Sequence, residues 1–387
     1  MTTASSPKPT GLEGLVAGPT AICAVQQEDL VYRGYGVHEL AEHATFEEVA
    51  YLLLAGEKPS DSELNAFRRE LVEARALPEP VRTYLDSAAV MLQTGTTVPM
   101  DVLRTAVSLL GNLEPQSQAI GAEAELAKAK TLLARIPTVI GHMQRAADGK
   151  QPVDPETGGD PDLGHAANLL YLLTGEKPTE EATRVMDVSL ILYAEHDFNA
   201  STFTARVIAS TLSDLHGAVT GAIAALKGPL HGGANEAAME MLKEIREAVD
   251  AGETVDAWME RAFAEKRKLM GFGHRVYKNG DHRAPILMEL GKKLAEAAGG
   301  DAPAWFELGE QVQRVMLEKK SIHPNVDFPC GMTYFTMGIP VPQYTPIFVA
   351  SRVSGWAAHV LEQHANNRLI RPLAEYVGPA YRKWRDG

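Results

Sequence analysis

The chain has 387 residues and a formal net charge of −13, with 45% hydrophobic and 22% charged residues. This length suits one large domain with a smaller partner, or two ordinary domains, and the composition is globular rather than disordered. The acidic balance argues against nucleic acid or an anionic membrane surface as a partner. The chain has two cysteines and no CxxC pair, which disfavours a disulfide framework and a zinc ribbon.

The first residues and the apolar segments indicate the cellular compartment of the protein. The first residues lack the apolar core of a signal peptide, and no apolar run approaches the roughly 18 residues of a membrane span. We therefore expect a cytoplasmic protein with no membrane partner.

Helix signals are dense from residue 45 onward. Thr45 and Glu48, and then Ser60 and Glu63, have the spacing of a capping box at a helix start. The first box predicts a helix over 46–55 that ends at a glycine. The segment YLLLAGEKPS after residue 50 has an echo, YLLTGEKPT, after residue 170, which predicts two helix corners of the same type.

Most of the remaining chain also has helical periodicity. Alternating strand patterns are almost absent, and the stretch 21–35 predicts short strands at most. The further predicted helices are Asp101–Leu110, Glu181–Tyr193, Asn235–Val249, Ala304–Lys319 and Pro346–Asn366.

One candidate catalytic histidine lies in the loop GPLHGGANE. Pro229 blocks helix continuation before His231, and Asn235 is expected to cap a helix after it. At a helix N-terminus the dipole disfavours an imidazolium, so we expect a neutral ring that donates one hydrogen bond. The alternative is a turn histidine satisfied by the backbone.

A second candidate, His274, lies in MGFGHRVYKNGDHR, where Gly271 and Gly273 let the backbone approach a ligand. Residues 261–283 hold seven lysines and arginines against two acidic residues. Such local positive charge suits phosphate or carboxylate recognition, although a solvated basic helix face is the alternative. The segment matches neither a Walker A loop nor a dinucleotide-binding turn.

One carboxylate and three basic side chains are further candidates for the functional site. Asp327 lies between two prolines in HPNVDFPCG, where desolvation can raise its pKa into the range of a general base. A turn aspartate is the alternative. His196 lies in AEHDFNAS, while Arg352 and Arg371 lie in the C-terminal segment. Their alternatives are a core histidine and, for Arg371, a helix-end charge.

Taken together, GPLHGGANE, GFGHRVYK and PNVDFPCG, in that order, resemble the citrate synthase family, which includes 2-methylcitrate synthases. The similarity extends from about residue 11 to about residue 379. It implies a catalytic triad of His231, His274 and Asp327. It also implies oxaloacetate-binding and, more weakly, CoA-binding residues. The oxaloacetate binders are His196, Arg283, Arg352 and Arg371, and the CoA binders are Lys268, Lys278 and Lys320.

The resemblance further implies an all-α fold with an active-site cleft between two helical domains. We expect residues 226–338 to form the small domain, and residues 1–225 with 339–387 to form the large one. The family forms homodimers that open and close on oxaloacetate, and Arg371 is expected to reach the partner subunit's site.

The implied reaction joins the acetyl group of acetyl-CoA to oxaloacetate and releases CoA. Asp327 takes the α-proton, His231 stabilises the enolate, and His274 protonates the new alkoxide as an imidazolium or strong donor. No metal or other cofactor is required. Activity on propionyl-CoA, or on both thioesters, is the close alternative.

Two alternatives from other classes remain at this point. One is an inactive relative that senses CoA or oxaloacetate, although such a protein has no need of a general base. The other is a histidine metalloprotein, since the chain has 12 histidines, although HExxH and zinc-finger spacings are absent.

Overall fold

The computed structural model describes residues 14–26, 29–274, 276–277 and 280–383. Within these ranges the chain forms sixteen α-helices, one 3₁₀ turn and one small sheet. The prediction of an all-α fold is confirmed.

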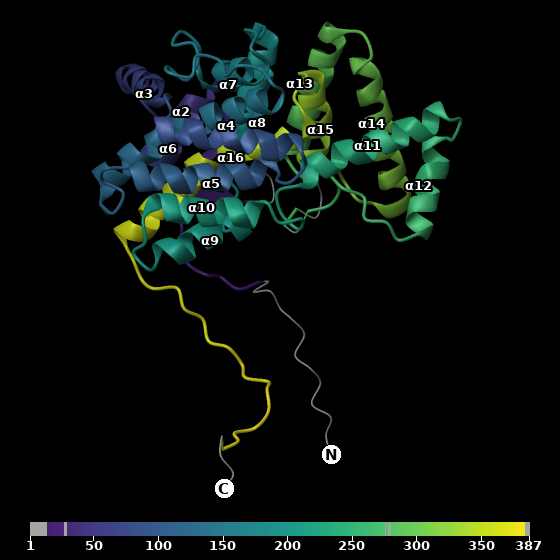
Figure 1. Ribbon diagram of the computed structural model, residues 1–387. Coiled ribbons are helices and arrows are strands. Elements are labelled where there is room, and N and C mark those ends of the chain that lie inside the picture. Colours follow the sequence, from purple (N-terminus) through teal and green to yellow (C-terminus); the bar gives the residue numbers. More distant parts are fainter. Residues whose placement is uncertain (1–13, 27–28, 275, 278–279, 384–387) are drawn as a thin grey trace.

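Two groups of helices are visible in Figure 1, one formed by most of the chain and one by α11–α15. The first group is α1 (Val37–His43), α2 (Phe46–Ala55), α3 (Asp61–Ala74), α4 (Glu79–Gln93), α5 (Pro99–Leu113), α6 (Ala122–Ala147), α7 (His165–Thr174), α8 (Glu180–Tyr193), α9 (Ala200–Ala209), α10 (Leu215–Leu226) and α16 (Tyr344–Ala365). The second is α11 (Ala234–Asp250), α12 (Val255–Ala264), α13 (Arg283–Ala298), α14 (Ala302–Lys320) and α15 (Asp327–Thr336). The 3₁₀ turn is Val341–Gln343. The division into domains at residues 226 and 338 stays a prediction.

The sheet is antiparallel and has the order β1 (Cys23–Val25), β2 (Leu30–Tyr32), β3 (Tyr35–Gly36). Apart from Gly36, it falls inside the stretch 21–35 for which short strands were predicted. Cys23 pairs with Tyr32 in the register of the first two strands. The hydroxyl of buried Tyr32 donates to the carbonyl of Glu195 at 2.9 Å, which fastens the sheet to the chain just after α8.

The predicted caps have the expected geometry. Both capping boxes form, at the starts of α2 and α3. Gly56 and Gly175 end α2 and α7 with φ values of 93° and 82°, a left-handed conformation that favours glycine. The two echoing segments are therefore two helix corners of the same type.

One predicted cap is wrong. Helix α11 begins at Ala234, its N-cap is Gly233, and no side chain caps it. Asn235 lies inside the helix, where its side chain is fully buried. His231 nevertheless precedes the helix N-terminus, as predicted.

Helix α16 is the central element of the larger group and is surrounded by α2, α6, α8, α9 and α10 (Figure 1). All its residues from 344 to 360 are buried. Because no face meets water, the segment has no amphipathic stripe, and the predicted range 346–366 began two residues late. Burial on all sides also fixes the polar side chains that α16 carries.

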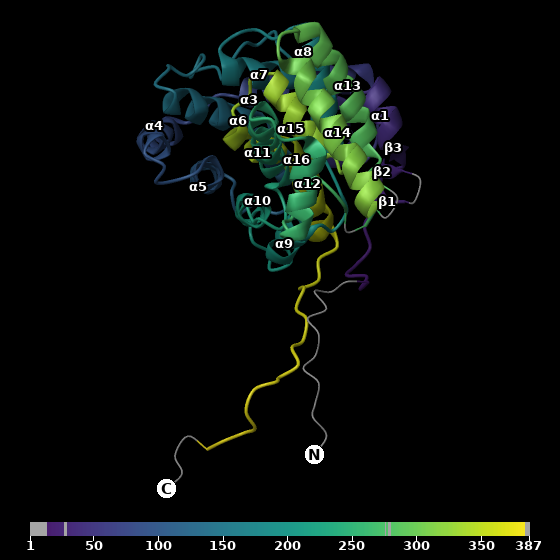
Figure 2. The ribbon, with the colours of Figure 1, turned by 90° about the vertical axis from the view of Figure 1, so that its right-hand side faces the viewer.

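Beyond α16 the chain is extended. Residues 371–383 are all exposed, and both views show this segment leaving the body of the protein (Figure 2). In the part of the chain that is described, no helix has the length and apolar character needed to cross a membrane.

Candidate active site

Most of the predicted site residues converge between the two groups of helices. His196 follows α8, His231 precedes α11, His274 lies between α12 and α13, Arg283 and Asp327 are the first residues of α13 and α15, and Arg352 lies in α16. The rings of His196 and His274 have centroids 5.0 Å apart. The positive charge of Arg352 is near enough to lower the pKa values of both His231 and Asp327.

Backbone pairing joins the two loops that carry the candidate residues His274 and Asp327. The amide of Gly273 donates to the carbonyl of His323 at 2.9 Å, and the amide of Asn325 donates to the carbonyl of Gly271 at 2.9 Å. Gly271 has a φ of 80°, and a Cβ there would lie 2.9 Å from that of Phe328. A glycine is therefore required for this close approach, which places His274 beside the start of α15.

The hydrogen bonds of His231 determine its tautomer. Its Nε2 accepts from the backbone amide of Ser201 at 3.2 Å and lies 2.8 Å from the Ser201 hydroxyl. Trp356 donates to the same hydroxyl at 3.1 Å. Because Nε2 is an acceptor, the ring proton is on Nδ1. Burial, and then Arg352, lowers the pKa of His231 to about 4, so the ring is neutral.

His274 is held in the opposite tautomer. Its Nδ1 accepts from the amides of Val276 at 3.1 Å and Tyr277 at 3.3 Å, which leaves the proton on Nε2. Burial, and then the charge of Arg283, lowers the pKa of His274 to about 4. Of the two forms expected from the sequence, the structure favours the neutral donor over the imidazolium.

Asp327 has the properties of a general base. Its Oδ1 accepts a hydrogen bond from the Tyr193 hydroxyl at 2.7 Å. No described residue donates to its Oδ2. Burial raises the pKa of Asp327 to about 6, although the Tyr193 hydrogen bond and the charge of Arg283 act in the other direction. A carboxylate in this range accepts a proton near neutral pH.

The two buried arginines differ in their partners. Arg283 forms a bidentate ion pair with Asp281, at 2.9 Å for Nε and 2.8 Å for Nη2. Arg352 donates from Nε to the carbonyl of Tyr193 at 2.6 Å, and its guanidinium lies over the ring of Phe348. Within the described ranges neither Nη of Arg352 has a hydrogen bond. A buried guanidinium without a carboxylate is a site for an anion, so Arg352 is the stronger candidate.

His196 is also buried and neutral. Its Nε2 lies 3.1 Å from the hydroxyl of Tyr277, whose ring packs against both His196 and His274. Burial, and then Arg283, lowers the pKa of His196 well below its usual value. The predicted substrate histidine is therefore within the cluster.

Other predicted residues lie elsewhere. Arg371 is exposed and belongs to the segment after α16, which Figure 1 shows extending away from the helices. Lys268 and Lys320 are both exposed, and the Nζ of Lys320 lies 4.5 Å from the ring centroid of Phe263. Lys278 lies outside the described residues.

The predicted cationic stretch is partly neutralised. Arg261 pairs with Glu253 and Arg267 with Glu244, both acids from outside the stretch. Sequence counting could not reveal these ion pairs, because the partners come from α11 and from its connection to α12.

The chain is similar to known proteins over nearly its whole length. Residues 11–373 match the family model described as "Citrate synthase, C-terminal domain". The chain belongs to the citrate synthase family. It is 47% identical to "2-methylcitrate synthase" of Shewanella oneidensis over 96% of each chain, and 42% identical to "Citrate synthase 2" of Bacillus subtilis over 97% of each chain. It is thus an enzyme of the type that transfers an acyl group.

Solved citrate synthases have the same fold. The enzyme of Thermoplasma acidophilum, in a ternary complex with carboxymethyl coenzyme A and oxaloacetate, matches 98% of this chain and 98% of its own with a TM-score of 0.87 and 31% identity. The enzyme of Pyrobaculum aerophilum matches 99% of this chain and 96% of its own with a TM-score of 0.84 and 36% identity.

The sequence analysis did not identify several polar residues of this candidate site. Tyr193, Ser201 and Asp281 each bond directly to a candidate residue. Tyr193 and Ser201 flank the segment that holds His196, and Asp281 lies two positions before Arg283. Proximity to a motif was therefore the available signal, but which atoms meet depends on the packing of α8, α9 and α15.

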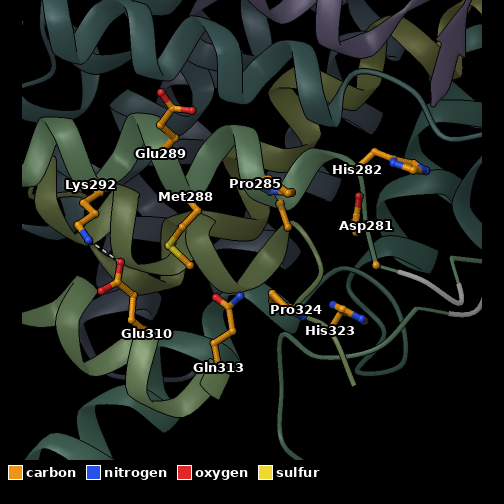
Figure 3. A pocket seen from close by; sticks show the side chains of 12 residues that line it. Asp281, His282, Pro285, Met288, Glu289, Lys292, Glu310, Gln313, His323 and Pro324 are labelled. Atoms are coloured by element: carbon orange, nitrogen blue, oxygen red, sulfur yellow. Dashed lines mark hydrogen bonds and ion pairs between the residues drawn. The ribbon is translucent and has the colours of Figure 1, made fainter. Parts of the chain in front are cut away.

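A cavity of about 470 Å³ opens beside the cluster, between α13 and α14. Figure 3 shows Lys292 of α13 paired with Glu310 of α14 on one side and His282 and His323 on the other. Of the predicted catalytic, oxaloacetate-binding and CoA-binding residues that the structure describes, none lines it. Its wall includes Asp281, the partner of Arg283.

Proposed function

We propose that this protein is a citrate synthase that condenses acetyl-CoA with oxaloacetate and hydrolyses the thioester to give citrate and free CoA. The observation that carries the proposal is that four groups lie together in one site. Asp327 is a carboxylate of raised pKa, and His231 and His274 are neutral imidazoles in opposite tautomers. The fourth group is Arg352, a buried arginine that has no carboxylate partner among the described residues.

The reaction begins with a weak carbon acid. Asp327 removes a proton from the acetyl methyl through Oδ2, the oxygen that has no donor from the described chain. As negative charge develops on the thioester oxygen, the Nδ1–H of His231 donates a hydrogen bond to it. A neutral donor suits this role because it stabilises the enolate without having to give up a proton.

The second step forms the carbon–carbon bond. The enolate carbon attacks the keto carbon of oxaloacetate, and the keto oxygen becomes an alkoxide. The Nε2–H of His274 faces this charge and supplies the proton. Water then adds to the thioester carbonyl and returns a proton to His274. The carbon–sulfur bond breaks, and CoA leaves as a thiol with the proton that Asp327 took from the methyl group. No step calls for a metal or other cofactor.

Oxaloacetate is a dianion and needs cationic partners. We assign one carboxylate to the Nη groups of Arg352 and include His196 in the same site. Arg283 contributes its charge, and because its Nε and Nη2 are committed to Asp281 it has fewer free donors. Arg371 belongs to the site of a partner subunit in a homodimer. CoA phosphates are assigned to Lys268, Lys278 and Lys320.

The acyl-CoA preference is tested by release of free thiol in the presence of oxaloacetate. Acetyl-CoA and propionyl-CoA are compared side by side, and we expect the higher kcat/KM with acetyl-CoA. A higher value with propionyl-CoA assigns the protein to the 2-methylcitrate synthases with the same mechanism. Folded protein that releases no thiol from either compound contradicts the enzymatic proposal.

A further inference from the structure

Tyr193 contacts two of the groups that carry the proposed reaction. It is the last residue of α8 and is buried. Its hydroxyl donates to Oδ1 of Asp327 at 2.7 Å, and its carbonyl accepts from Nε of Arg352 at 2.6 Å. One residue therefore connects the proposed base, on α15, with the proposed anion binder, on α16.

The position of Tyr193 is itself well determined. Its ring lies 4.5 Å, centroid to centroid, from that of Phe348, and the guanidinium of Arg352 covers the same Phe348 ring at 4.7 Å. Three side chains and one backbone carbonyl thus form a single packed unit. Because the phenol cannot move freely, its hydroxyl selects one rotamer of Asp327.

We propose that Tyr193 is a positioning residue of this enzyme: its hydroxyl occupies Oδ1 of Asp327, so that Oδ2 is the oxygen that meets the acyl group, while its carbonyl orients Arg352. This inference rests on the proposed function. Tyr193 itself exchanges no proton with substrate.

The charges around Asp327 come from several elements. Arg283 of α13 and Arg352 of α16 favour the carboxylate, and Asp281 opposes it. Cys330 of α15 has a thiol pKa raised to about 12 by burial and stays neutral. Burial raises the pKa of the Tyr193 phenol well above its usual value, so it remains a donor throughout the working pH range. The Tyr193 hydrogen bond therefore stabilises the charged form of Asp327.

The first test is Tyr193→Phe, which removes the hydroxyl and keeps the ring and the carbonyl. The acid limb is the fall of kcat/KM at low pH, where Asp327 becomes protonated. Loss of one hydrogen bond to the carboxylate is expected to raise the midpoint of this limb by roughly half to one pH unit. The KM for oxaloacetate should stay within about twofold, because the carbonyl that orients Arg352 is retained.

The matched control is Tyr334→Phe. Tyr334 is equally buried at the same contact between α8 and α15, but its hydroxyl pairs with Ser189 at 2.8 Å instead of Asp327. Because the Tyr334 hydroxyl does not bond to Asp327, its loss should leave the midpoint of the acid limb unchanged. The same acid limb in both variants, or a KM change without a shift of the limb, overturns the proposal.

A second measurement needs neither turnover nor Tyr193→Phe. The protonation of Asp327 is followed by infrared titration of the substrate-free protein, with the carboxyl band assigned by its loss in Asp327→Asn. Tyr193→3-fluorotyrosine keeps the shape and strengthens the donor, so the midpoint should fall relative to the wild type. An unchanged or higher midpoint contradicts the inference, while absence of thiol release in the wild type contradicts only the proposed function.

Discussion

At the residue scale, the chemistry of the site depends on which nitrogen of each histidine carries the proton. The sequence predicted a neutral His231 from its place before a helix. The ring is neutral, but the main causes are burial and Arg352, and the tautomer is determined by the backbone of Ser201. The segment that holds Ser201 lies 30 residues earlier, so only the fold could reveal this contact.

The arginines lead to a prediction on binding. Arg352→Lys keeps the positive charge but removes the Nε–H that bonds to Tyr193 and the fork that suits a carboxylate. We expect the KM for oxaloacetate to rise by about 10- to 100-fold, with a smaller change in kcat. Arg246→Lys, at an exposed ion pair on α11, is the control and should behave as the wild type. Unchanged oxaloacetate affinity in Arg352→Lys contradicts the assignment.

The pKa values predict the pH dependence of activity. Asp327 must be ionised to act as a base, so kcat/KM should fall as the pH drops through about 6. His231 and His274, with pKa values of about 4, stay neutral over this range and add no limb above pH 6. A pH profile that is flat down to pH 5 contradicts the base assignment.

At the scale of elements, helix starts and ends were predictable where short motifs determine them. The boxes at Thr45 and Ser60 and the glycines after α2 and α7 are local signals, and each appears in the structure. The start of α11 was misplaced by one residue because no side chain caps it. The ends of α16 were imprecise because burial on all sides leaves no periodic pattern.

Packing around α16 leads to a prediction on stability. A Cβ at Gly355 would lie 2.1 Å from Oε2 of Glu195 and 2.4 Å from the carbonyl of Ala194. Gly355→Ala should lower the free energy of unfolding by about 1–3 kcal/mol, or prevent folding. Gly233→Ala is the control, since its Cβ would meet no atom within 4 Å and its φ is −78°. Equal urea midpoints for the two variants would disprove this packing argument.

At the scale of the whole molecule, buried histidines make stability depend on pH. Burial lowers the pKa of His165 to about 3 and of His216, His231 and His274 to about 4. The unfolded chain binds these protons at higher pH, so stability is lost as the pH falls from about 6.5 toward 4.

Two carboxyls act in the opposite direction. Burial raises the pKa of Asp187 to about 7 and of Asp327 to about 6. These two shifts stabilise the folded protein as the pH falls. The four histidine shifts have the larger combined effect on stability in the same pH range. Urea unfolding between pH 7 and pH 4 should show a net loss of stability, and His216→Asn should reduce its slope. A net gain toward pH 4 would contradict this account.

The exposed C-terminal segment leads to a prediction on assembly. If Arg371 acts in the partner's site, a dimer of one Asp327→Asn and one Arg371→Ala subunit has one intact site. Mixing the two inactive proteins under subunit exchange should then restore about a quarter of wild-type activity, since half of the dimers are mixed. If Arg371 acts within its own chain, mixing restores nothing.

The sequence thus predicted the fold class, and most of the residues it proposed for the site lie close together in the structure, because motifs identify residue types. It could not predict the bonds that join Tyr193 to Asp327 or Arg283 to Asp281. The first depends on the packing of α8 against α15, and the second on the turn before α13.

The most direct test of the central claim is Asp327→Asn, measured for thiol release with acetyl-CoA and for oxaloacetate binding by calorimetry. We expect thiol release to fall at least about 100-fold, the lower range for loss of a general base, while oxaloacetate affinity is retained. Asp187→Asn, a buried carboxyl on α8 that bonds to Phe46 and Arg184, is the control and should keep its activity. Near-normal thiol release by Asp327→Asn would contradict the account.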